Sequence, residues 1–84
     1  MRGVKAAEKY TAKQGQYLAF FYYYTKVNGQ PPAETDIARY FGVTPESAHG
    51  MIVTLEKRKL ITKVPWQARS IRVLLRREEL PELE

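Results

Sequence analysis

The sequence predicts a mainly α fold with a small β-hairpin, arranged as a three-helix winged helix-turn-helix. Three observations favour this fold. Apolar residues recur at helical spacing over three stretches, residues 11–27, 33–41 and 45–58. A glycine-containing turn joins the second stretch to the third, as it does in helix-turn-helix motifs. Two β-branched runs, residues 60–64 and 70–75, then flank a short polar turn and predict the hairpin.

The first predicted helix has sequence signals at both ends. Thr11-Ala12-Lys13-Gln14 matches the S/T-x-x-E/Q capping box, in which the two side chains bond to free backbone N–H groups. Asn28-Gly29 and then Pro31-Pro32 end the helix. Its buried face is predicted from apolar residues at helical spacing: Tyr17, Leu18, Phe21 and Tyr24.

Three aromatic residues of the same helix lie outside this predicted face: Phe20, Tyr22 and Tyr23. A helix that is apolar on all sides is usually buried on all sides, and a domain of this size has little room for that. Two interpretations stay open. The rings can lie along the surface with the tyrosine hydroxyls in water, or they can form a contact surface for a partner.

The second and third helices carry the ordered signals of a helix-turn-helix. The second helix has one predicted buried stripe: Ile37, Ala38 and Phe41. Gly42 stands where the turn needs a positive φ, Thr44 then caps the third helix, and Pro45 suits its first position. The predicted buried stripe of the third helix is Ala48, Met51, Ile52 and Leu55. An antiparallel helix pair in a small bundle is the plainer alternative.

Length and charge limit the possibilities further. The 84 residues predict one domain, divided into a flexible basic arm (1–10), a folded part (11–75) and an acidic tail (76–84). The formal net charge is +5, but four of the nine acidic residues fall within residues 78–84. Residues 1–77 hold 14 Lys and Arg against 5 Asp and Glu, so the body is basic and suits a polyanionic partner.

Several classes of protein are disfavoured by what the sequence lacks. There is no cysteine, which removes disulfides and thiolate metal sites. The first nine residues have no apolar core, so they do not form a secretory signal, and no apolar run approaches the roughly 18 residues of a membrane span. No nucleophile–base pair, phosphate-binding glycine loop or metal-ligand cluster is visible. We therefore expect no catalysis, no cofactor, no metal and no membrane contact.

The face of the third helix opposite its buried stripe is the candidate surface for reading DNA. At about 100° per residue, this face carries Glu46, His49, Gly50, Val53 and Lys57. Glycine inside a helix costs about 1 kcal/mol in propensity; close approach to another molecule is one reason to keep it, and simple tolerance is the other. Glu46 can accept from a cytosine amino group, and Val53 can touch a thymine methyl. His49 is the only histidine and has no partner at metal-ligand spacing, which leaves a base or phosphate contact or a solvated surface position.

The tip of the predicted hairpin holds Trp66, Gln67 and Arg69. A tryptophan beside an arginine suits contact with the sugar-phosphate backbone or the minor groove, and the alternative is that Trp66 folds back as a lid on the core. Basic residues around the helix end and the hairpin add charge for phosphate contacts: Lys57, Arg58, Lys59, Lys63 and Arg72. The complete candidate DNA-binding set is Thr44, Pro45, Glu46, Ser47, His49, Gly50, Val53, Lys57, Trp66, Gln67, Arg69 and Ser70.

Residues 10–75 resemble the DNA-binding domain of LexA-type repressors. The matching segments are Thr11–Gln14, Gly29–Pro32, Asp36–Ala38, Phe41–Gly42, Thr44–Pro45, Leu55–Ile61 and Ala68–Val73. The resemblance implies a winged-helix fold, operator binding and transcriptional repression. It does not include the self-cleaving serine-lysine protease domain of these repressors, so the chain is similar to stand-alone regulators built on the same domain.

The chain also departs from the LexA pattern. The turn after Gly42 is one residue shorter, Ala33 replaces the threonine that usually caps the second helix, and Lys59 stands where a glycine normally ends the third. The candidate base-reading positions differ from the asparagine and glutamates that LexA uses: Glu46, His49 and Gly50. The operator sequence of LexA is therefore not carried over.

The resulting prediction is a sequence-specific regulator, with repression as the expected effect, that binds double-stranded DNA in the cytoplasm. One recognition helix reads few base pairs, so we expect a homodimer on two half-sites, with Phe20, Tyr22 and Tyr23 as its candidate interface. The alternative is a winged-helix module for protein–protein interaction that uses the aromatic first helix. The mid-helix glycine opposite the apolar stripe and the basic hairpin favour DNA.

Overall fold

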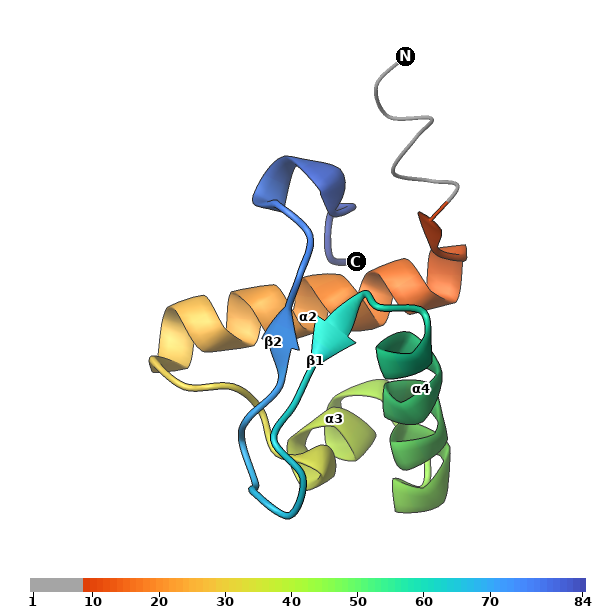
Figure 1. Ribbon diagram of the computed structural model, residues 1–84, viewed down its shortest axis with the longest axis vertical. Helices are drawn as coiled ribbons and strands as arrows, with labels where there is room; N and C mark the ends of the chain where they lie inside the picture. Colours follow the sequence, from red (N-terminus) through yellow and green to blue (C-terminus); the bar gives the residue numbers. More distant parts are fainter. Residues whose placement is uncertain (1–8) are drawn as a thin grey trace.

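A computed structural model describes residues 9–84 (Figure 1). In this part of the chain, three helices precede a two-stranded antiparallel sheet and a short 3₁₀ helix. They are α2 (Ala12–Asn28), α3 (Glu34–Phe41), α4 (Pro45–Lys57), β1 (Ile61–Thr62), β2 (Arg72–Val73) and η1 (Arg77–Glu79). The predicted winged helix-turn-helix is confirmed, and every predicted helix end lies within one residue of its observed position. The predicted N-terminal arm lies, for residues 1–8, outside the described residues.

The helix ends form largely as their sequences predict. Thr11 Oγ1 accepts from the Gln14 N–H at 3.1 Å and Gln14 Oε1 accepts from the Thr11 N–H at 3.0 Å, which completes the capping box. The glycines that follow α2 and α3 have φ angles of 77° and 67°. Ala33 has no side-chain acceptor for the start of α3. The Asp36 carboxylate instead accepts from the Ala33 N–H at 2.9 Å.

The core lies where the three helices meet the hairpin. Its largest hydrophobic side chains at 2% exposure or less come from all of these elements: Tyr17, Leu18, Phe21, Ile37, Ile52, Leu55 and Ile61. The predicted buried faces of the helices are thus confirmed, with Tyr24, Phe41 and Met51 packed at the edge of the core.

Phe20 is a correction to the sequence prediction. It is only 7% exposed, and its ring stacks on Tyr40 with the ring centroids 4.3 Å apart. Phe41 also meets it edge-on at 5.5 Å. The end of α3 covers this side of α2, so Phe20 belongs to the core and is not surplus surface. Tyr22 and Tyr23 are half-buried and pack against each other at 5.1 Å.

The hairpin is shorter than predicted. The ladder contains only the pairs Ile61–Val73 and Thr62–Arg72, whereas the sequence predicted strands over residues 60–64 and 70–75. Two non-glycine residues of the loop have positive φ angles, Trp66 at 65° and Arg69 at 55°. This backbone cannot continue a β-ladder, so residues 66–69 form the turn that the sequence predicted between the two strands.

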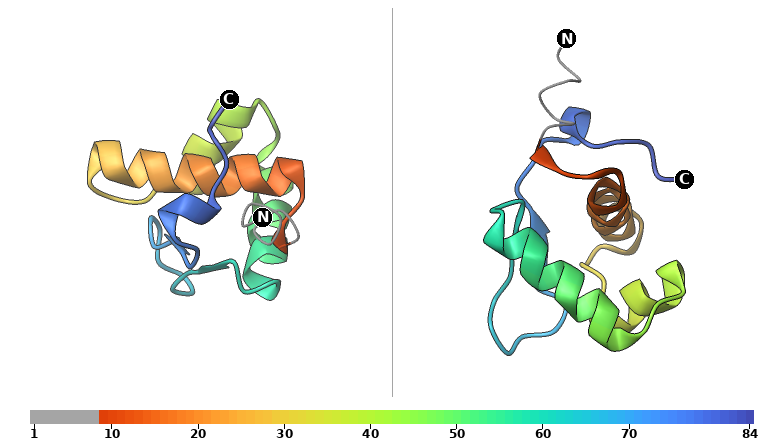
Figure 2. Two further views of the ribbon diagram at one scale, coloured as in Figure 1. Left: turned by 90° about the horizontal axis from the view of Figure 1, so that it is seen from above. Right: turned by 90° about the vertical axis from the view of Figure 1, so that its right-hand side faces the viewer.

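Residues 76–84 pack across α2 (Figure 2). Gln16 binds this segment at two points: its Nε2 donates to the Glu82 carbonyl at 2.9 Å, and its Oε1 accepts from the Glu84 N–H at 2.9 Å. Gly15 makes the crossing possible, because a Cβ there would lie 2.7 Å from the Tyr10 ring and 3.1 Å from Pro81 Cγ. The segment predicted as an acidic tail is therefore packed against the domain.

Candidate nucleic-acid interface

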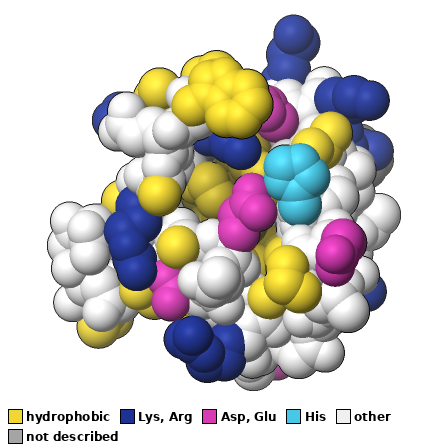
Figure 3. Space-filling model, turned by 90° about the horizontal axis from the view of Figure 1, so that it is seen from below, with side chains coloured by type: hydrophobic (Ala, Val, Ile, Leu, Met, Phe, Trp, Pro, Cys, Tyr) yellow, Lys and Arg dark blue, Asp and Glu magenta, His cyan; other side chains and the backbone are white. Residues whose placement is uncertain are grey.

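The wing loop (residues 65–70), α3 and the beginning of α4 lie at the same end of the molecule (Figure 1). Figure 3 looks onto this end and shows basic, acidic and hydrophobic side chains and the histidine around a hollow. A pocket of about 600 Å³ lies here, with residues from all three elements in its wall. The structure thus brings together predicted site residues that lie apart in the sequence: His49, Trp66, Gln67, Arg69 and Ser70.

The outer face of α4 is open to solvent. Glu46, His49, Gly50 and Lys57 are exposed, and Val53 is half-buried. A Cβ added to Gly50 would meet nothing within 4 Å. Nothing in the described fold therefore requires a glycine at this position.

The start of α4 uses part of the predicted set for its own structure. Thr44 Oγ1 accepts from the Ser47 N–H at 3.1 Å and lies 3.1 Å from Ser47 Oγ. This is the N-cap predicted from the sequence, followed by Pro45 in the first turn. The Thr44 hydroxyl is thus held at the cap, whereas Pro45, Glu46 and Ser47 are exposed at the beginning of α4.

His49 contacts a residue that the sequence analysis did not assign to the site. Its Nδ1 lies 3.0 Å from Glu34 Oε2 at the beginning of α3. Lys63 Nζ of the wing approaches the same oxygen at 4.0 Å. Glu34 therefore lies between His49 of α4 and Lys63, which follows β1.

The tip of the wing extends into solvent. Trp66 is fully exposed, with a relative accessibility of 103%, so its interpretation as a lid on the core is wrong. Gln67 is also exposed, and its N–H donates to the Val64 carbonyl at 3.2 Å to close the turn.

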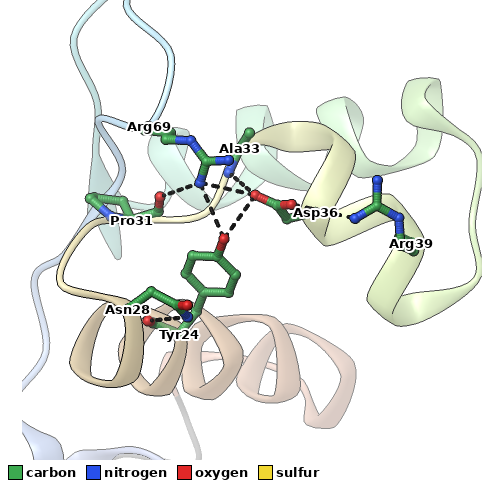
Figure 4. Close-up of polar contacts among 7 residues, drawn as sticks. All are labelled: Tyr24, Asn28, Pro31, Ala33, Asp36, Arg39 and Arg69. Carbon is green, nitrogen blue, oxygen red and sulfur yellow. Dashed lines mark hydrogen bonds and ion pairs between the residues drawn. The ribbon is translucent and has the colours of Figure 1, made fainter.

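Arg69 points inward, in contrast to its predicted contact with DNA (Figure 4). Its Nη1 lies 3.1 Å from Asp36 Oδ2 and 3.2 Å from both the Tyr24 hydroxyl and the Pro31 carbonyl. The Tyr24 hydroxyl also donates to Asp36 Oδ2 at 3.2 Å. Arg69 therefore ties the wing to α2 and α3.

Ser70 likewise serves the wing itself. Its Oγ accepts from the Val64 N–H at 3.0 Å and donates to the Gln67 carbonyl at 2.9 Å. Since these bonds replace ladder bonds, they also explain why the strands end early. Ser70 shapes the loop and has no free hydroxyl proton for a phosphate.

The electrostatics of Asp36 depend on the same contacts. The hydrogen bond from the Ala33 N–H, the neighbouring Arg69 guanidinium and the Tyr24 hydroxyl together hold the pKa of the Asp36 carboxyl below its usual range. The hydrogen bond with Tyr24 and the nearby carboxylate raise the pKa of Arg69. Both groups are therefore charged at neutral pH.

Sequence reasoning missed the residues that support the site, and the cause is their separation along the chain. Glu34 and His49 are 15 residues apart, and Tyr24 and Arg69 are 45 residues apart. Helical periodicity reports only contacts within one element. The crossing of α3 and α4 in a helix-turn-helix was the one signal that could have indicated the first pair.

Two other kinds of feature, a metal site and a membrane-spanning helix, were sought among the described residues. Residues 9–84 contain no group of three or more His, Cys, Asp or Glu side chains placed to bind a metal ion. Within the same range, no helix has the length and apolar character to cross a membrane.

Comparison with known proteins identifies relatives of one kind. The LexA repressor of Thermosipho melanesiensis is 40% identical over 73 residues, which cover 87% of this chain and 37% of that protein. The LexA repressor of Thermosipho africanus is 40% identical over 68 residues (81% and 34%), and that of Thermotoga maritima is 33% identical over 63 residues (75% and 32%). No family model matches the chain.

The chain spans about a third of the length of the curated relatives it matches. The match covers most of this chain, and the fold is the one that the resemblance implied. The predicted resemblance is confirmed: this chain is similar, over most of its length, to proteins named LexA repressor, and it has the form of a LexA-type DNA-binding domain.

Proposed function

We propose that the chain binds double-stranded DNA in a sequence-specific manner and represses transcription. In this proposal α4 enters the major groove, and the wing loop, residues 65–70, lies against the backbone or the minor groove. The observation that carries the proposal is Gly50, a helix-weakening residue in the middle of an exposed face where the fold has no use for it. Its lack of a side chain lets the helix backbone approach a base edge closely.

Two further observations support DNA as the partner. Trp66 extends beside the open face of α4 as a large exposed apolar group at the wing tip. Five basic residues line the end of α4 and the wing: Lys57, Arg58, Lys59, Lys63 and Arg72. The relatives are named as repressors, which supports repression as the effect of DNA binding.

The first experiment enriches random duplexes on the purified chain and sequences them. We expect a short motif, and a steep salt dependence for the selected duplex. Five phosphate contacts give a slope of roughly −4 to −5 in log K against log[salt]. A flat salt response, or no enrichment, would sink the proposal and leave the protein–protein module as the better explanation.

Base contacts and phosphate contacts separate in the same assay. His49→Ala or Glu46→Ala should change which duplexes are enriched, with losses of about 1–3 kcal/mol for a base-contacting pair. Lys57→Ala, the matched control at the end of the same helix, should weaken all duplexes alike. An unchanged motif in the first two variants would mean that another face of the protein reads the DNA.

We also propose that the chain binds DNA as a homodimer through α2. The candidate contact is now Tyr22 and Tyr23 with Val27, which is 80% exposed, since Phe20 lies in the core. The test combines Tyr22→Ser with Tyr23→Ser and measures the mass in solution and the cooperativity on a duplex with two half-sites. Loss of cooperativity with retained single-site binding supports this interface. If both measurements match the parent, α2 is not the interface.

A further inference from the structure

The beginning of α3 places an acidic residue where a DNA-binding surface would ordinarily exclude one. Glu34 Oε2 is 3.0 Å from His49 Nδ1 and 4.0 Å from Lys63 Nζ. The side chains of Glu34 and His49 are 40% and 55% exposed. Pairs this exposed contribute little to folding, so stability alone is a weak reason for the contact.

The contact has a chemical consequence for the other ring nitrogen of His49. A carboxylate only accepts hydrogen bonds, so Nδ1 must carry the proton that it shares with Glu34. In a neutral imidazole, Nε2 then has a free lone pair and acts as an acceptor. The position of Glu34 thereby sets whether His49 accepts or donates at Nε2.

In the major groove this difference separates the bases. Cytosine N4 and adenine N6 present amino donors, whereas guanine presents the O6 and N7 acceptors. An Nε2 acceptor can therefore accept a hydrogen bond from cytosine or adenine. Opposite guanine, two acceptors would face each other and no hydrogen bond could form. With Nε2 protonated, it instead donates to major-groove acceptors such as guanine O6 and N7, and guanine is no longer excluded.

We infer that Glu34 is a specificity-determining positioning residue: it fixes the imidazole of His49 so that Nε2 selects a base amino group and discriminates against guanine. This inference rests on the proposed function, because it needs α4 in the major groove. Lys63 Nζ lies 4.0 Å from the same carboxylate, so its positive charge favours the ionised form of Glu34 that accepts from His49.

The first test needs no DNA. His49 is the only histidine of the chain, so the imidazole ¹⁵N spectrum, recorded at about pH 8.5, reports this residue alone. We expect the Nδ1–H tautomer in the parent. Glu34→Gln keeps the shape, but its amide can either accept from or donate to Nδ1, so we expect a mixture of tautomers. A dominant Nε2–H tautomer in the parent would overturn the inference.

The second test enriches duplexes at the same pH with the parent, Glu34→Gln, His49→Ala and the double variant. We expect cytosine or adenine at one position for the parent, with about tenfold discrimination against guanine. That discrimination should shrink to about threefold or less in Glu34→Gln. Glu34→Gln should have no effect on base preference once His49 is alanine, because Glu34 acts through His49.

The outcomes separate the inference from the proposed function. If Glu34→Gln leaves the base preference unchanged, or changes it equally in the His49→Ala background, Glu34 has no positioning role. If no duplex is enriched by any variant, the proposed function and this role both fall, and the ¹⁵N result then describes a surface contact only. Glu56→Gln, which removes an exposed charge elsewhere on α4, is the control for charge alone.

Discussion

Within the described residues 9–84, two helices carry a glycine in their interior, and the structure explains only one of these two glycines. Gly15 in α2 lies under a crossing, where a Cβ would collide with Tyr10 and approach Pro81. Gly50 in α4 faces open solvent, with nothing within 4 Å of a Cβ. Both weaken their helices by about 1 kcal/mol relative to alanine. Gly15 is therefore required by the packing of the fold, whereas the fold gives no reason for a glycine at position 50.

The wing contains the same contrast over a few residues. Arg69 is bound by Tyr24, Pro31 and Asp36 within the domain, while Trp66 is fully exposed. Both have left-handed backbone angles, yet one side chain turns inward and the other outward. One loop thus contains both a side chain bound within the domain, Arg69, and a side chain fully exposed to solvent, Trp66.

The largest expected effect comes from filling the space beside Gly50. Gly50→Leu should leave the fold intact, because the position is open, and should lower affinity for the selected duplex by about 100-fold by holding α4 away from the bases. Gly50→Ala should stabilise the domain by about 0.5–1 kcal/mol and weaken binding about tenfold. Thermal unfolding and DNA titration measure the two effects separately. If Gly50→Leu bound the duplex as tightly as the parent, Gly50 would have no role in DNA binding.

The next effect concerns how Arg69 acts. Arg69→Met keeps the apolar stem but removes the guanidinium that ties the wing to α2 and α3, so we expect about tenfold weaker binding to all duplexes. Because no phosphate contact is lost, the salt slope should stay the same. Lys57→Ala is the matched comparison and should reduce the slope by about one. A reduced slope for Arg69→Met would instead place its guanidinium on a phosphate.

These contrasts also show what the sequence could predict. Helical spacing, the Thr11 and Thr44 caps and the glycine turn gave the elements and most of the core, because those signals act within a few residues. The inward turn of Arg69 and the burial of Phe20 depend on contacts between elements, which no local pattern contains. The open face of α4 was predictable because a helical projection already separates it from the buried stripe.

A smaller effect is expected at Gly15. Gly15→Ala gains helix propensity, but its Cβ would lie 2.7 Å from the Tyr10 ring. Overpacking of about 1–3 kcal/mol outweighs the gain, so we expect a net loss of about 1 kcal/mol and a Tm lower by roughly 4–8 °C. Affinity for the selected duplex should not change, since Gly15 lies outside the pocket formed by the wing loop, α3 and α4. Gly50→Ala, the same substitution in the other helix, should shift Tm in the opposite direction.

The smallest effect is a pH dependence that tests whether Arg69 belongs to the fold. The pKa of the Asp36 carboxyl is lowered in the folded chain by the Ala33 N–H and by Arg69. The ionised carboxylate therefore contributes stability above its unfolded-state pKa of about 4, and this contribution disappears as pH falls through the lower folded-state value. Asp36→Asn removes the titrating group. The difference in Tm between parent and variant should be largest near neutral pH and should shrink steadily below about pH 4. A Tm difference that is the same at every pH would show that the Asp36 charge, and hence its pairing with Arg69, does not hold the wing in place.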